Sequence, residues 1–272
     1  MANATRALRR FAQETRGLAP SELEIHDSSQ LRIARQHLHQ AAGAAEMVGQ
    51  ASPASLLLAM ESATQYFAQH PERCTEEAAS RIERAGFGLM QYFESVLNGK
   101  PTSAVALFPQ YRDIQALAGN DRVHPADLWS VHWAWQDPEI PQTVAPLGYD
   151  TQAKAHFEQA ILQCIKSQDG EAARFLRDLT LGFAATQTAR QPLVFWKLCA
   201  GFFEANALGL CAKDVHVKRA TSRILQQFSA LVRGELGVPD RLAQDILFFC
   251  AQARPTPEMT APVLNAVRQT FG

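Results

Sequence analysis

The sequence predicts an all-α fold made of two tandem antiparallel helical bundles joined by a connector rich in tryptophan and proline. Apolar residues recur at three- and four-residue spacing through most of the chain, and the alternation typical of strands is scarce. Hydrophobic residues make up 47% of the sequence, which is enough to build a core without disulfides or metal ions. A length of 272 residues is above that of a usual single domain and favours two.

The first bundle is expected within residues 1–100. Pro53 follows Ser52, a favourable pairing of a cap with a first-turn residue. Thr75 precedes two glutamates, which places carboxylates at the positive end of a helix. Gly99 and Pro101 end that helix. The expected helices cover residues 2–17, 28–50, 53–70 and 75–98.

Residues 101–149 differ in composition from the flanking segments. They hold six of the fourteen prolines and three of the four tryptophans. The large aromatic side chains favour burial, so we expect an ordered connector that packs on one or both bundles, with a short helix near 109–118.

The second bundle is expected over residues 150–272. The dipeptide at Asp169 and Gly170 and the segment 237–240 separate helical stretches. The expected helices cover residues 151–167, 169–189, 192–211, 214–233, 238–253 and 257–270.

Bulk properties exclude several classes of protein. A net charge of −1 argues against nucleic acid or an anionic membrane surface as the main partner. The five cysteines are far apart and lack metal-ligand spacing, which indicates free thiols in a reducing cytoplasm and no metal site. The apolar stretch 192–211 contains Lys197 and Glu204, each costing roughly 3 kcal/mol at a bilayer centre, so we expect a buried helix and no membrane insertion. No cofactor motif is present.

The helix expected over residues 28–50 carries the most specific candidate site. Its apolar stripe leaves His39 on the outer face, with Arg35 one turn before it and Gly43 one turn after it. Glu46 continues the same face. A glycine inside a helix costs up to about 1 kcal/mol relative to alanine, and close approach of a partner surface would compensate for that cost. A neutral imidazole beside a bare backbone patch and a cation suits phosphoryl transfer.

A segment in the second half of the chain shows weak sequence similarity to this one. Aligning residues 38–47 with 196–205 places Lys197 at the histidine position and superposes Gly201 on Gly43 and Glu204 on Glu46. If the two segments are copies of one module, the second copy lacks the histidine. Its polar face is then either a pseudo-site that docks a partner or the polar edge of a core helix.

The pattern His39, Gly43 and Gly49 resembles the histidine-phosphotransfer (HPt) domain, whose motif is His-x-x-Lys-Gly on one helix of a four-helix bundle. Ala42 occupies the lysine position here. The wider segments LRIARQHLHQAAGAAEMVG, IERAGFGLMQYFESVLNGKP, ALFPQYRDIQALAGNDRVHPADLW and DVHVKRATSRILQQFSALVRGE resemble the N-terminal region of CheA-type (ChpA- or PilL-like) hybrid histidine kinases, and also the FimL family of scaffold proteins, which is similar to that region.

The resemblance implies tandem HPt-like modules in a chemotaxis-like, cytoplasmic two-component system of type IV pili and twitching motility. The implied partners are a histidine kinase domain and a response-regulator receiver domain. Two hypotheses stay open at this point. In one, His39 is a phosphoacceptor; in the other, the same face binds signalling partners without chemistry. A helical adaptor unrelated to phosphorelays is a third alternative.

Overall fold

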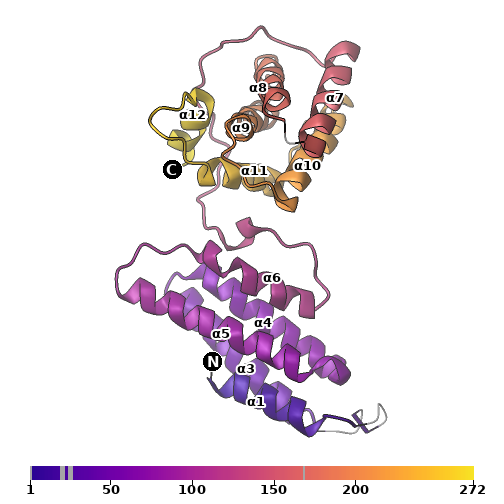
Figure 1. Ribbon diagram of the computed structural model, residues 1–272, viewed down its shortest axis with the longest axis vertical. Coiled ribbons are helices and arrows are strands. Elements are labelled where there is room, and N and C mark those ends of the chain that lie inside the picture. The colour runs from indigo at the N-terminus through magenta and orange to yellow at the C-terminus, as the bar shows by residue number, and fades with distance from the viewer. Residues whose placement is uncertain (1, 19–21, 24–26, 168) are drawn as a thin grey trace. The chain divides into compact units, whose positions relative to one another are not determined.

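The computed structural model describes residues 2–18, 22–23, 27–167 and 169–272, and it is all-α over those residues. The chain divides into two compact units, residues 1–130 and 131–272. Figure 1 shows the two groups of helices along the chain. Among the described helices, none combines the length and the low polarity that crossing a bilayer requires.

The N-terminal unit contains five described α-helices. They are α1 (Ala2–Glu14), α3 (Ser29–Met47), α4 (Ala51–Gln69), α5 (Glu76–Leu97) and α6 (Phe108–Leu117). Helix α1 packs against both α3 and α5, α3 packs against α4, and α6 packs against α4 and α5. Each helix turns an apolar stripe inward, as the three- and four-residue spacing predicts, and the large side chains fully buried in the unit include Leu8, Phe11, Leu31, Leu38 and Phe67.

A tight turn at Gly49 joins α3 to α4. Gly49 adopts a φ of +74°, in the left-handed region that favours glycine. The Gln50 N–H donates to the Ala45 carbonyl and the Gly49 N–H to the Glu46 carbonyl, so the last turn of α3 is closed by its own backbone. This turn makes α3 and α4 antiparallel neighbours, which places residues of α4 beside the outer face of α3.

The C-terminal unit contains six described α-helices. They are α7 (Thr151–Ser167), α8 (Gly170–Ala184), α9 (Arg190–Ala207), α10 (Val215–Val232), α11 (Asp240–Gln252) and α12 (Pro262–Phe271). Helix α9 packs against α8, α11 and α12 and lies at the centre of this unit (Figure 1). Most of its residues are buried, because it is apolar on nearly every face.

Residues 131–149, here called the strap, contain no helix or strand and lie along the C-terminal unit. The Trp133 ring stacks on Phe271 of α12 at 5.7 Å between centroids. The Trp135 indole N–H donates to Asp240 at 2.8 Å. The strap also approaches α8 so closely at Gly182 that an added Cβ would lie 2.9 Å from the Leu147 Cβ. The preceding residues 101–130 pack in the N-terminal unit, through α6 and two short 3-10 helices.

Candidate functional site

His39 lies on the outer face of α3, as the helical spacing predicts. Its side chain is 71% exposed. The preceding turn carries Arg35, also exposed, while Leu38 and Ala42 point into the core. The imidazole therefore stands at the surface of the N-terminal unit, on a helix anchored by its opposite face.

Glu61 of α4 connects His39 to Arg35. Its carboxylate accepts from the His39 Nδ1 at 3.1 Å and from the Arg35 Nε at 3.4 Å. The Arg35 Nη1 also donates to the Gln65 side-chain oxygen at 2.6 Å. Glu61 is only 16% exposed, so its side chain is held between the two helices while both of its partners reach solvent. Two residues from each helix thus form one polar cluster.

The contact with Glu61 determines which ring nitrogen of His39 is available. A carboxylate only accepts hydrogen bonds, so the Nδ1 of His39 carries the proton in this arrangement. In the neutral imidazole the lone pair then lies on Nε2, which is the nucleophilic nitrogen. A nucleophile held by an orienting carboxylate is one arrangement that is compatible with covalent catalysis by a side chain.

The surroundings of His39 are open on one side. An added Cβ at Gly43 would meet no atom within 4 Å, so the backbone there is accessible to an approaching surface. Glu46 is exposed one turn further along α3. Ala42 occupies the position of the HPt lysine and is 1% exposed, so no cation stands there. The nearest cation to His39 along α3 is Arg35, one turn before the histidine, whereas Gly43 lies one turn after it.

The residues of α9 that align with the His39 segment do not form an exposed surface. The Lys197 ammonium donates to the Asp137 carboxylate and to the Pro138 carbonyl of the strap. Gly201 is buried, and an added Cβ would lie 3.1 Å from the Val267 side chain of α12. Glu204 is 2% exposed. These three residues lie beneath the strap and α12, so their common role in the described fold is internal packing.

Glu204 has a structural partner that explains its burial. Its carboxylate accepts from the Leu264 N–H at 2.7 Å, in the first turn of α12, and lies 3.6 Å from the Arg177 guanidinium of α8. Ala261, the residue before α12, has no side chain able to cap it. Burial raises the pKa of Glu204, and the Leu264 N–H and Arg177 partly offset that rise.

Reasoning from the sequence missed Glu61 and Gln65. A signal was present, because Glu61 is the only charged residue of α4, ASPASLLLAMESATQYFAQ, and Gln65 follows one turn later on the same face. The pairing with His39 could not be read from spacing along the chain, since 22 residues separate the two.

Comparisons with known proteins bear on the C-terminal half. Searches of curated proteins and of solved structures found no match. Residues 142–272 match a protein-family model described as the second domain of the FimL scaffold protein. That segment spans most of the C-terminal unit, from within the strap to the last residue. Over that segment the chain is similar to the FimL scaffold family.

Proposed function

We propose that the chain is a signalling scaffold of the FimL type, acting in the cytoplasm in the two-component signalling of type IV pili. The family match over residues 142–272 carries this proposal. The resemblance of the N-terminal segments to CheA-type kinases points to the same system, and to receiver or kinase domains as partners. In this role the polar cluster of His39, Arg35, Glu61 and Gln65 belongs to a docking face on α3.

A binding experiment tests the scaffold role. Purified full-length chain is titrated with purified receiver and kinase domains of the type IV pilus chemosensory system, and the heat of binding is measured. We expect one of these domains to bind. Arg35→Glu should weaken that binding about tenfold, because it reverses a charge at the docking face and breaks the contact with Glu61.

Arg174→Glu provides a matched control, since Arg174 is an exposed arginine of α8 in the other unit. Its affinity should equal that of the unaltered chain. If none of the domains binds, the scaffold proposal is wrong. If Arg35→Glu and Arg174→Glu bind equally well, α3 is not the docking face.

One observation favours a second candidate function, phosphoacceptance at His39. The hydrogen bond from Nδ1 to Glu61 leaves the lone pair on Nε2, in a side chain that is 71% exposed. With a partner kinase holding ATP, Nε2 would attack the γ-phosphorus, the N–P bond would form and the bond to the β–γ bridging oxygen would break. ADP would leave, and the proton on Nδ1 would stay in contact with Glu61.

Labelling with radioactive ATP in the presence of a purified partner kinase tests this second function. We expect acid-labile label on the chain, and none on His39→Gln. Glu61→Gln should slow labelling by about 10²-fold, because the charge that stabilises the imidazolium is lost. Glu258→Gln, the same change at an exposed residue of the C-terminal unit, should label normally. Absence of label from the unaltered chain, under conditions that label an HPt domain, would leave only the scaffold role.

A further inference from the structure

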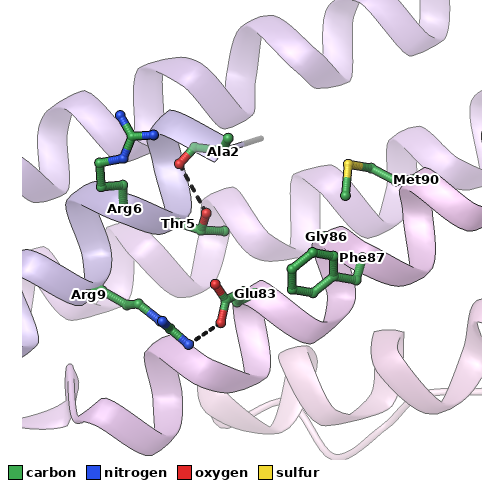
Figure 2. Close-up of a pocket in the computed structure, with 8 residues that line it drawn as sticks. All are labelled: Ala2, Thr5, Arg6, Arg9, Glu83, Gly86, Phe87 and Met90. Carbon is green, nitrogen blue, oxygen red and sulfur yellow. Dashed lines mark hydrogen bonds and ion pairs between the residues drawn. The ribbon is translucent and has the colours of Figure 1, made fainter.

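Helix α1 covers only part of the surface that α3 and α5 present to it. The ion pairs from Arg16 to Glu76 and from Arg9 to Glu83 show that α1 runs antiparallel to α5. Helix α1 begins at Ala2, which lines a hollow of about 310 Å³ together with Met90 of α5. Figure 2 shows Ala2, Phe87 and Met90 there, and the contact between Arg9 and Glu83. Helix α5 continues for seven residues beyond Met90, about 10 Å, without α1 beside it.

A second hollow lies near the first residues of α1, next to the first hollow. It has a volume of about 380 Å³, Met90 lines both hollows, and nearly all of its surface is apolar. It is lined by Ala44 of α3, by Val48 just after that helix, by Met90 and Phe93 of α5, and by Leu57 of α4. We call this hollow the α3–α5 groove. Two large apolar side chains at the ends of the flanking helices are almost fully exposed, namely Met47 (84%) and Leu97 (86%).

Three carboxylates of α5 form a row along the side of that helix that meets α1 and then the α3–α5 groove. Glu76, Glu83 and Glu94 are spaced by seven and eleven residues, close to two and three helical turns, so they lie along one line. The first two bind arginines of the α1 segment. Glu94, beside the groove, is exposed and forms no ion pair among the described residues.

We propose that the α3–α5 groove binds an amphipathic helix of a partner protein that has apolar residues on one face and a lysine or arginine at its edge. The partner helix would lie end to end with α1 and place its cation against Glu94. The packing of α1 supports this chemistry, because α1 is itself amphipathic and sets arginines against the same row of carboxylates. This binding surface does not involve the polar cluster at His39.

A second copy of the chain is a poorer occupant than a partner helix. Among the described helices, the most basic amphipathic ones are α1 and α10. Each has two large apolar side chains fully buried in its own unit, Leu8 and Phe11 in α1 and Ile224 and Phe228 in α10. Releasing either helix would expose two large apolar side chains, each costing about 1.5–3 kcal/mol.

Fluorescence anisotropy with a model helix tests the proposal on the full-length chain. The probe is a fluorescein-labelled peptide of two Leu-Lys-Ala-Leu-Lys-Lys-Ala repeats, and its counterpart carries glutamate in place of every lysine. We expect the basic peptide to bind at least tenfold more tightly than the acidic one. Ala44→Arg should weaken the basic peptide about tenfold by filling the groove, and Glu94→Lys about fivefold by reversing the edge charge.

Matched controls make the same chemical changes away from the groove. Ala155→Arg alters an exposed alanine of α7, and Glu258→Lys alters an exposed carboxylate of the C-terminal unit. Both should bind the basic peptide as the unaltered chain does, and circular dichroism checks that all variants fold. Equal binding of the two peptides, or no effect of Ala44→Arg, would overturn the proposal. So would sedimentation that shows a dimer lost on Ala44→Arg, because the groove would then be a contact between copies.

Discussion

Glu204→Ala is expected to lower the free energy of unfolding of the C-terminal unit by about 1–3 kcal/mol, the usual cost of leaving a buried hydrogen-bond donor without its acceptor. The substitution leaves the Leu264 N–H without its acceptor and removes the carboxylate that lies 3.6 Å from the Arg177 guanidinium. It also opens a void between α9 and α12. Urea denaturation of the full-length chain, read by hydrogen exchange in peptides of α9 and α12, measures the loss in this unit.

Glu204→Gln is the matched control for that prediction. Its side-chain oxygen can still accept from Leu264, and Arg177 keeps its contact with Asp178 at 2.8 Å. We therefore expect a loss of about 1 kcal/mol. If the alanine variant lost no more than the glutamine variant, the capping of α12 by Glu204 would contribute nothing.

The unaltered chain and Glu204→Gln should also differ in how their stability depends on pH. Burial raises the pKa of Glu204, so the folded state holds this proton more tightly than the unfolded state does. The stability of the unaltered chain consequently falls as the pH rises from the unfolded pKa of a glutamate through the folded one, and then stays lower. Glu204→Gln lacks this dependence, so acidification should favour the unaltered chain relative to the variant.

Trp196→Ala, a separate substitution, should lower the free energy of unfolding of the same unit by about 3–5 kcal/mol. Trp196 is fully buried in α9 and contacts the rings of Phe157, Phe183 and Phe228, with centroids 5.2–6.0 Å away. Its indole N–H donates to the Tyr149 hydroxyl at 2.7 Å. Burial raises the pKa of Tyr149 to about 12, so that phenol stays neutral and can accept the bond.

Trp196→Phe separates the ring packing from the hydrogen bond. It keeps an aromatic ring in the cluster but leaves the Tyr149 hydroxyl without its donor, which costs about 1–3 kcal/mol. Thermal unfolding of the three proteins, followed by near-ultraviolet circular dichroism, should rank them with the alanine variant least stable. A phenylalanine variant as unstable as the alanine variant would show that the hydrogen bond, and not the ring packing, dominates.

The helices could be predicted from the sequence because their signals are local. The spacing of apolar residues predicts the ends of each of the eleven described α-helices to within five residues. The Thr75 hydroxyl caps α5 by accepting from the Ala78 N–H, whereas the cap expected at Ser52 is wrong, because α4 already begins at Ala51. The exposure of His39 follows from the same spacing.

What the sequence left open depends on contacts between distant residues. Lys197 and Glu204 stand on one face of α9, and no local rule says whether that face meets solvent. It is covered because Asp137 of the strap and Leu264 of α12, each 60 residues away, supply partners for the two charges. The contact of Glu61 with His39 could not be predicted for the same reason, since only the antiparallel pairing of α3 and α4 brings the two side chains together.

The strap has a consequence for how the C-terminal half can be isolated. Its carbonyls accept from Lys197 and Arg190, and its Leu147 N–H donates to the Gly182 carbonyl. A recombinant fragment that starts at Asp150 lacks all of these contacts, whereas one that starts at Val131 retains them. A synthetic peptide spanning the strap should therefore restore the stability of the shorter fragment when the two are mixed. This half of the molecule is then suited to complementation assays.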